Sequence, residues 1–251
     1  MSEARNIKKD ILYEDNHILV LNKRPSDIVQ GDKTKDTPLS EILKEYIKVQ
    51  YNKPGNVFLG VAHRLDRPVS GAVVFAKTSK ALVRLNEMLR DKKLEKTYWA
   101  VVEQRPEMEN GNLVQFMRKD QEKNKSFVVN EKTKGALRAE LNYKLINASD
   151  NFNLLEIKLI TGRHHQIRAQ LAKIGCPIKG DLKYGYKRSN SNASIHLHSR
   201  MLEFIHPVKK TPIKIIAPPP DEPLWNHFLA NVGGKTENRS QKTEVGRKSR
   251  Q

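Results

Sequence analysis

The chain has 251 residues, of which 37% are hydrophobic, and its 46 Lys and Arg against 28 Asp and Glu give a formal net charge of +18. No apolar run approaches the roughly 18 residues of a membrane span, and no apolar stretch follows the basic N-terminal residues as it would in a secretory signal. The single Cys176 can form no internal disulfide, so we expect a soluble, cytoplasmic protein and exclude a membrane protein or a disulfide-stabilised one.

The positive charge is not confined to the C-terminus. The last twenty residues, 232–251, hold six basic and two acidic side chains, so residues 1–231 still carry +14. We expect residues 1–231 to form one domain and residues 232–251, rich in Gly, Ser, Thr and charge, to be a basic disordered tail. A surplus of this size either solubilises the surface or attracts a polyanion, and nucleic acid is the partner that it favours.

Hydrophobic periodicity predicts alternating strands and helices in the first half of the chain. Residues 17–23 read as a strand. Residues 37–51 read as a helix, because apolar side chains recur at helical spacing and Thr37 and Pro38 suit its N-cap and first turn. The pattern then predicts strands at 57–61 and 71–77, joined by the segment HRLDRPVS, and a helix at 79–90.

The second half of the chain reads mainly as strands. Strands are expected at 96–103, 137–146, 153–160, 195–205 and 213–217. The charged segment 117–126 is interpreted as a solvated loop, 161–175 as a turn that runs into a helix, and the residues near 223–231 as a last helix. Runs of strands with few helices predict an α+β fold built on a mixed, mainly antiparallel sheet.

One short segment brings a carboxylate, Asp66, among three basic side chains, His63, Arg64 and Arg67. An Asp that follows a strand is most often a turn or cap residue, and neighbouring arginines often form only surface pairs. Nearby cations nonetheless favour the ionised form and depress the pKa of a carboxyl group. We therefore interpret Asp66 as a carboxylate nucleophile or charge stabiliser rather than a proton donor.

A second group of polar residues, TGRHHQIR at 161–168, contains two arginines near the expected start of a helix. The simplest interpretation is a basic helix face that touches phosphate. Arg168 follows His164 by four residues, so both are expected on one face, from which the guanidinium can hold a carboxylate by a two-pronged bond. A carboxylate that stays ionised in a pocket poor in water needs such a fixed cation.

Tyr98 faces away from Thr97 and Trp99 if the strand 96–103 alternates regularly. A tyrosine in a strand usually fills a core, and stacking on a nucleic-acid base is the functional alternative.

Histidines occur in two close pairs, His164 with His165 and His196 with His198. Adjacent helical residues point about 100° apart, and no HExxH, CxxC or acid-cluster pattern accompanies them. No GxxxxGK[ST] or GxGxxG loop occurs either. The sequence therefore predicts no metal site and no nucleotide or other cofactor.

Taken together, these stretches resemble the RluA-type RNA pseudouridine synthases over most of residues 11–220. The resemblance rests on HRLDRPVSGAVVFAK, EKTYWAVV, LITGRHHQIRAQLAKIGCPIKGDLKYG and IHLHSRMLEFIHP, in this order. Many members read TSG where this chain has VSG, TGRTHQIRVH where it has TGRHHQIRAQ, and KPxG where it has KRPSD. The chain thus departs from the pattern at Pro68, Val69, His164 and Gln170, with the acid and Arg168 intact.

The resemblance implies a mixed, mainly antiparallel sheet with a central active-site cleft and flanking helices, and a reaction that needs no cofactor. It implies that Asp66 is the catalytic aspartate, Arg168 its ion-pair partner and Tyr98 the ring stacked beneath the uracil. Arg64 resembles the side chain that fills the gap left by the flipped nucleotide. The RNA contacts that we predict are Arg64, His63, Arg67, Arg163, His164 and His165.

The expected reaction is the isomerisation of specific uridines in structured rRNA or tRNA, carried out by a monomer. Only ten residues precede the matched region, so we expect no small N-terminal RNA-binding (S4) domain. The sequence does not choose between attack of Asp66 on C1′ and on C6 of the uracil. Two alternatives remain: a catalytically silent RNA-binding module, and a metal-dependent nuclease that uses the histidines with Asp66 or Asp181.

Overall fold

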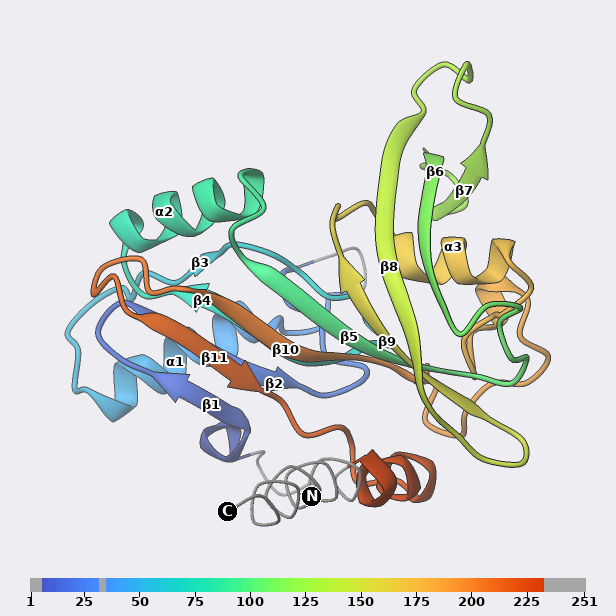
Figure 1. Cartoon of the computed structure of the whole chain (residues 1–251). Coiled ribbons are helices and arrows are strands. Elements are labelled where there is room, and N and C mark those ends of the chain that lie inside the picture. The colour runs from blue at the N-terminus through green and yellow to red at the C-terminus, as the bar shows by residue number, and fades with distance from the viewer. Residues whose placement is uncertain (1–5, 32–34, 233–251) are drawn as a thin grey trace, which may run out of the picture.

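The computed structural model describes residues 6–31 and 35–232, so the predicted tail lies outside the described residues from 233 onward (Figure 1). The strands are β1 (Ile11–Glu14), β2 (Ile18–Lys23), β3 (Gly60–Val61), β4 (Ser70–Ala76), β5 (Glu95–Val102), β6 (Asn110–Asp120), β7 (Lys125–Val129), β8 (Leu137–Ala148), β9 (Asn153–Leu159), β10 (Leu197–Ile205) and β11 (Pro212–Ile216). The helices are α1 (Leu39–Gln50), α2 (Ser79–Arg90) and α3 (Gln166–Lys173), the 3-10 turns η1 (Ile7–Asp10) and η2 (Leu182–Tyr184), and a last helix over 223–232.

Within the described residues the strands form one sheet in the order β1-β2-β4-β10-β5-β9-β8-β6-β7, with β3 on β4 and β11 on β10. The pair of β4 and β10 is parallel, and every other named strand pair in this part of the chain is antiparallel. The predicted α+β class with a mixed, mainly antiparallel sheet is confirmed. No helix in residues 6–31 or 35–232 is long and apolar enough to cross a membrane.

The half of the sheet around β4 is covered on both faces, which explains why its run SGAVVFA is apolar without alternation. Val73 and Phe75 pack with Leu43 of α1 in one cluster of buried side chains. Ala72 and Val74 pack with Ala81 and Leu85 of α2 in another. The helices α1 and α2 therefore lie on opposite faces of this half, and β4 is its fully buried centre.

The other half of the sheet is covered in the same way by the helices that come later in the chain. Tyr98 and Ala100 of β5 belong to the cluster that contains Ile167 of α3. Trp99 and Val101 belong to a cluster with Trp225 and Phe228 of the last helix. Alternation along β5 is thus as predicted, and Tyr98 faces the side of the sheet on which α1 and α3 lie.

The charged segment 117–126 is not a loop, contrary to the sequence prediction. It forms the end of β6, a turn, and the start of β7, which pairs with β6 from Phe116↔Val129 to Asp120↔Lys125. We call β6, β7 and residues 137–144 of β8 the arm, which rises beyond the rest of the sheet at the upper right of Figure 1. Polar residues dominate here because much of each strand faces solvent, so the apolar alternation that marks a strand is weak.

Several predicted element ends also differ from the structure. Only Gly60 and Val61 of the predicted strand 57–61 are extended in the sheet. The N-cap of α1 is Pro38 and not Thr37, and no side chain caps this helix. The segment 161–175, expected to be a turn that runs into a helix, becomes helical only at Gln166, because His165 has a left-handed backbone with φ 52°. His164 therefore lies outside the helix, and the prediction that it shares a helical face with Arg168 is wrong.

Gly71 stands where the two halves of the sheet join. Its φ is 113°, and a Cβ there would lie 2.4 Å from the carbonyl oxygen of Ser199. Ser199 is its partner in the parallel pair of β4 and β10, next to the pair of Ser70 with His198. Only glycine lets the two backbones approach this closely.

We predict that Gly71→Ala lowers the free energy of unfolding by roughly 3 kcal/mol or more, since it adds a steric clash in the core to an unfavourable φ. Gly135→Ala is the matched control: Gly135 has φ 80°, but no described atom lies within 4 Å of a Cβ built there. This control should cost only about 1–2 kcal/mol. Urea unfolding measures both values, and equal losses would contradict the close-approach argument.

Candidate active site

A pocket of about 340 Å³ opens on the face of the sheet that carries α1 and α3. One wall comes from the segment that precedes β4 and the other from the segment between β9 and α3, so the two polar groups found in the sequence face each other. Tyr98 and Lys96 of β5 and Leu197 of β10 complete the lining. The lining residues are His63, Arg64, Leu65, Asp66, Val69, Lys96, Tyr98, Leu159, Gly162, Arg163, His164, His165, Gln166, Ile167, Arg168 and Leu197.

The backbone around Asp66 is fixed by a buried lysine at the end of β2. Lys23 is 1% exposed, and its ammonium donates to the carbonyl oxygens of Arg24, Arg67 and Val69 at 2.9, 3.0 and 2.6 Å. Val69 N–H in turn donates to the Asp66 carbonyl at 3.0 Å, closing a turn. Because three carbonyl groups converge on one cation, the carboxylate of Asp66 is presented from a rigid turn rather than a mobile loop.

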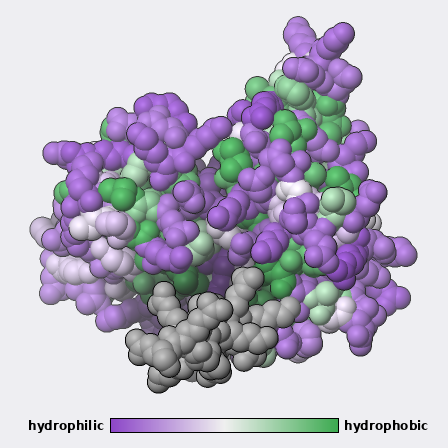
Figure 2. All heavy atoms as spheres, in the orientation of Figure 1, coloured by the Kyte–Doolittle hydropathy of each residue, from purple (hydrophilic) through white to green (hydrophobic). Residues whose placement is uncertain are grey.

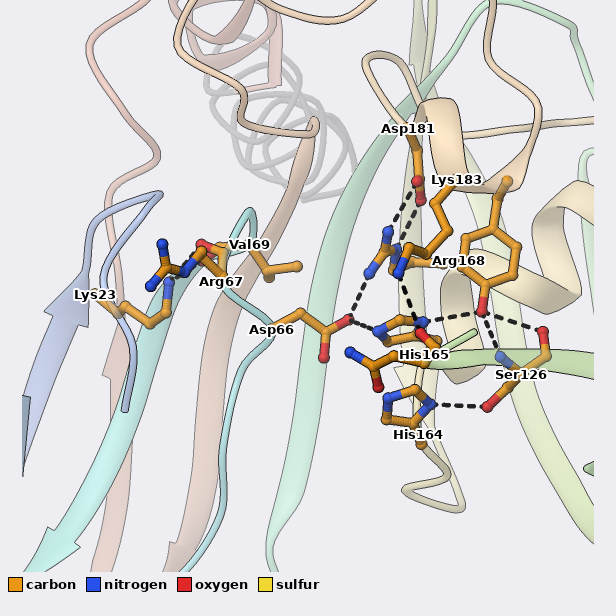
Figure 3. A network of polar contacts seen from close by, with 12 residues as sticks. Lys23, Asp66, Arg67, Val69, Ser126, His164, His165, Arg168, Asp181 and Lys183 are labelled. Carbon is orange, nitrogen blue, oxygen red and sulfur yellow. Dashed lines mark hydrogen bonds and ion pairs between the residues drawn. The ribbon is translucent and has the colours of Figure 1, made fainter. Parts of the chain in front are cut away.

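Arg168 holds two carboxylates at once. Its Nη1 donates to Asp66 Oδ2 at 3.0 Å, while Nε and Nη2 donate to Asp181 Oδ2 and Oδ1 at 2.7 and 2.9 Å. Figure 3 shows its guanidinium between the two acids. The two-pronged bond expected of Arg168 is therefore made, but with Asp181, and Asp66 receives a single bond.

The three charged residues Asp66, Arg168 and Asp181 are buried to different extents. Asp181 and Arg168 are 1% and 4% exposed, while the side chain of Asp66 is 30% exposed. Burial opposes the charged form of Arg168, but the bonds to Asp181 and the charge of Asp66 outweigh it and raise the pKa of the guanidinium above its usual range. The cation is permanent, and Asp66 keeps a free oxygen for a reactant in the pocket.

A second network connects the pocket with the arm. His165 Nε2 lies 3.4 Å from Asp66 Oδ2, and its Nδ1 lies 2.9 Å from the hydroxyl of Tyr184. That hydroxyl accepts from the backbone N–H of Ser126 in β7 at 2.9 Å. The Ser126 hydroxyl lies 2.9 Å from Nδ1 of His164, whose ring stacks on that of His165. The site is thereby tied to the base of β7 (Figure 3).

Neither histidine of this network supplies positive charge near neutral pH. Burial lowers the pKa of His165 to about 3, although the nearby Asp66 opposes the shift. Burial also lowers the pKa of His164. Both rings therefore act through shape and hydrogen bonds rather than through an imidazolium charge.

Tyr98 forms part of the pocket floor with its phenol buried. The residue is 6% exposed, and burial raises the pKa of its hydroxyl far above the usual range. Its side chain lies on the same sheet face as the Asp66 wall, between the paired residues Ser199 and Ile157 of the neighbouring strands. A planar group in the pocket can lie against this ring while the hydroxyl stays protonated.

The other predicted RNA contacts fall into two groups. Arg64 and Arg163 are exposed and line the pocket, so both guanidinium groups stand at its rim. Arg67 pairs with Asp36 and lies beside Lys23, outside the lining, so it points away from Asp66 (Figure 3). The cation next to Asp66 is therefore Arg168 from a distant helix rather than a sequence neighbour.

His63 lines the pocket but is engaged by the sheet. Its Nε2 accepts from the backbone N–H of Val74 at 3.1 Å, and burial lowers its pKa to about 3. The imidazole is thus neutral and holds the segment before β4 against that strand.

Lys23, Ser126 and Tyr184 were not predicted to belong to this site, and Asp181 was considered only for the nuclease alternative. Asp181 follows Gly180 in the stretch GDLKYG, which is part of the family resemblance. Its role depends on its burial in the folded chain, which the sequence does not show. The pattern KRPSD contains Lys23, but a lysine after a strand normally reads as a surface residue. Ser126 lies in the segment interpreted as a loop, so its distance from the pocket was not apparent.

Of the histidines considered for a metal-dependent nuclease, His164 and His165 line the pocket, whereas His196 and His198 lie away from it. His198 Nδ1 is 2.8 Å from Ser70 Oγ, and its Nε2 is 3.0 Å from the Ala217 carbonyl oxygen. His196 stacks on Trp225 beneath the last helix. Across residues 6–31 and 35–232, no group of three or more His, Cys, Asp or Glu side chains is arranged to hold a metal ion.

The comparison with known proteins accords with this arrangement. The family model for RNA pseudouridylate synthase matches residues 17–173, which include Asp66, Tyr98 and Arg168. The chain belongs to the RNA pseudouridylate synthase family. It is an isomerase that converts uridine to pseudouridine in RNA, as the resemblance in the sequence implied.

Curated relatives extend the match beyond these residues. Ribosomal large subunit pseudouridine synthase C of Buchnera aphidicola subsp. Acyrthosiphon pisum is 33% identical over 225 residues, which cover 87% of this chain and 69% of the relative. The synthase C of Vibrio vulnificus is 32% identical, with 87% and 68% covered. The chain thus spans about two thirds of the length of these synthases.

Solved structures show the same fold. The protein called Human RNA Pseudouridylate Synthase Domain Containing 4 superposes with a TM-score of 0.73 at 24% identity, covering 90% of this chain and 94% of that one. Human RNA Pseudouridylate Synthase Domain Containing 1 superposes with a TM-score of 0.65 at 18% identity. The pseudouridine synthase fold expected from the sequence is confirmed.

We predict that Asp181→Asn destabilises the protein by about 3–5 kcal/mol, because a buried guanidinium loses half of its charge compensation. Asp150→Asn, at an exposed turn between β8 and β9, removes a carboxylate of the same size and should change stability by less than about 0.5 kcal/mol. Urea unfolding compares the two variants. Identical midpoints would show that Asp181 does not hold Arg168 in the folded state.

Folding stability should decrease as the pH falls from about 6.5 toward 4. Burial lowers the pKa of His63 and His196 to about 3 and that of His198 to about 4, whereas an unfolded histidine titrates near 6.5. Below pH 6.5 these histidines bind protons in the unfolded state but not in the folded state. The free energy of unfolding therefore falls by up to about 1.4 kcal/mol per pH unit for each histidine.

Urea midpoints between pH 7.5 and 5 measure this slope. His198→Gln should flatten it, because one of these three proton-binding groups is removed from the unfolded state. A midpoint that stays constant over this range in the unmodified protein would contradict the neutral, buried state of these rings.

Proposed function

We propose that this enzyme isomerises specific uridines of ribosomal RNA, with Asp66 as the reacting carboxylate, Arg168 as its fixed cation and Tyr98 as the surface on which the uracil lies. The observation that carries the proposal is the single bond from Arg168 to Asp66 beside a doubly bound Asp181. This arrangement fixes Asp66 while leaving it one oxygen that faces the pocket.

The chemistry of the reaction suits such a site. Making pseudouridine breaks the bond between N1 and C1′, turns the ring, and joins C5 to C1′, with the C5 hydrogen lost to solvent as a proton and N1 taking up a proton. No electrons leave or enter and no water is consumed, so side chains suffice. A carboxylate can attack C1′ or C6 of the uracil, and the free oxygen of Asp66 is compatible with either step.

A uridine must leave its helix before its base can lie between the two walls of the pocket. Extruding a base costs a few kcal/mol and costs least in loops and irregular regions. Arg64 stands exposed at the rim of the pocket, beside the segment that carries Asp66. We propose that its side chain occupies the space left by the flipped nucleotide, while Arg163 on the opposite wall contacts phosphate.

Ribosomal RNA is the substrate class that the relatives favour, since several of them are named as synthases of the large ribosomal subunit. The net charge of +18 provides the attraction to any structured RNA, and tRNA is the other outcome of a substrate test. We propose that a monomer acts, because one chain supplies both walls of the pocket.

Release of tritium from rRNA labelled at uridine C5 tests the reaction, because the new bond to C1′ displaces that hydrogen. We predict release by the unmodified protein without added metal or nucleotide. Asp66→Asn should lower the rate by at least ~10³-fold, as removal of a reacting group does, with RNA binding retained.

Asp150→Asn is the matched control, since it removes an exposed carboxylate outside the pocket lining. Turnover by Asp66→Asn at the rate of this control would refute the role of Asp66. If neither the unmodified protein nor the control releases tritium from rRNA, the same assay on labelled tRNA decides between the two substrate classes.

A further inference from the structure

Lys96 lies in the wall between two cavities. It precedes Tyr98 by two residues in β5, so both side chains lie on the same face of the sheet. It lines the pocket that contains Asp66, and it also lines a neighbouring cavity of about 250 Å³ between the segment after α2 and the end of β9. Leu159 and Gly162 line both spaces as well, so the two cavities are adjacent.

The ammonium group of Lys96 has no acceptor in the part of the chain that the structure describes. Other lysines that point into the fold are satisfied: Lys23 donates to three carbonyl oxygens, and Lys77 pairs with Glu14 at 2.6 Å. Lys179 donates to Asn190 at 2.7 Å. A partly buried ammonium without a partner is costly, which indicates that an acceptor arrives from outside the protein.

The surroundings of Lys96 favour an anion. A Cβ on Gly162 would lie 3.6 Å from its Nζ, so the ammonium stands beside the backbone of the segment before α3, and both residues line the pocket. Burial lowers the pKa of Lys96, and no acid offsets the shift. Its charge also contributes, after burial, to the low pKa of His63.

The walls of the second cavity are basic too. Lys92 and Lys158 line it, with Glu95 as the acid of its wall, and Glu95 forms no ion pair with Lys96 in the described chain. A polyanion at the mouth of either cavity therefore meets positive side chains.

We propose that Lys96 binds a backbone phosphate of the RNA, next to the nucleotide whose base lies on Tyr98, and so positions that nucleotide against Asp66. The inference rests on the proposed function. Two strand residues span about 7 Å, so a base on Tyr98 has its adjoining phosphates within reach of a lysine two positions earlier. Lys96 acts as a positioning residue and takes no part in the bonds that break and form.

The test uses a stem-loop of rRNA that contains the modified uridine, prepared with one uncharged methylphosphonate at a time around that uridine. For the unmodified enzyme, one position should weaken binding about 10- to 100-fold, the loss of one charged hydrogen bond. The Lys96→Met variant should bind the native stem-loop more weakly by a similar factor. Its affinity should no longer depend on the methylphosphonate at that position. Lys96→Arg should restore most of the affinity and the sensitivity.

Three further measurements separate positioning from other roles. Lys96→Met should raise KM far more than it lowers kcat, and its salt dependence of binding should be shallower by about one phosphate contact. Its urea midpoint should match or exceed that of the unmodified protein, since methionine fills the site without an unpaired charge. Lys93→Met, at an exposed position outside both cavities, removes the same charge and should leave the methylphosphonate profile unchanged.

A profile in which the unmodified enzyme and Lys96→Met respond alike at every phosphate would overturn the proposal. So would a loss confined to kcat, which would instead assign Lys96 to proton transfer or to the uracil itself. The binding measurements need no turnover. A protein that binds the stem-loop through Lys96 but releases no tritium would therefore refute the proposed reaction and leave the phosphate contact standing.

Discussion

One guanidinium shared between two carboxylates is the constraint on which the active site depends. Asp181 is buried and takes two bonds from Arg168, so it fixes the plane of the guanidinium and compensates its charge. Asp66 takes the remaining bond and keeps access to the pocket. If Asp66 alone paired with Arg168, a two-pronged bond would occupy both of its oxygens and leave neither of them facing the pocket. Because the buried Asp181 takes the two-pronged bond, one oxygen of Asp66 stays available to a group in the pocket.

The sheet brings these groups together from distant parts of the chain. Asp66 precedes β4, Tyr98 lies in β5, and Arg168 lies in α3 after β9. The strand β10 stands between β4 and β5, and its parallel pairing with β4 at Gly71 joins the two halves of the sheet. A site built across this junction depends on how closely β4 and β10 approach each other. Gly71 allows this close approach because it has no side chain.

Much of this architecture could be predicted from the sequence, because apolar periodicity marks every element that is buried. The strands β4, β5, β9 and β10 and the helix α2 follow such patterns. The strands β6 and β7 of the arm did not, since much of each faces water, whereas its third strand, β8, was predicted at 137–146. That Arg168 can hold a carboxylate followed from its neighbours, and its pairing with Asp66 followed from the family resemblance. Its division between two acids did not, because nothing local distinguishes a buried Asp181 from a surface one. The left-handed His165, which delays the start of α3, likewise has no local signal in a run of helix-forming residues.

The arm is fastened to the pocket near the turn between β6 and β7, where Ser126 meets Tyr184 and His164. Its far end is the segment between β7 and β8, residues 130–136, and hydrophobic side chains gather along the outer surface of the arm between hydrophilic ones (Figure 2). Residues can be inserted or removed in that segment without disturbing the fastened end. Evolution can therefore change how far the arm extends along a folded RNA while the residues of the pocket stay the same. Proteins that share this fold can in this way come to act at different sites on RNA.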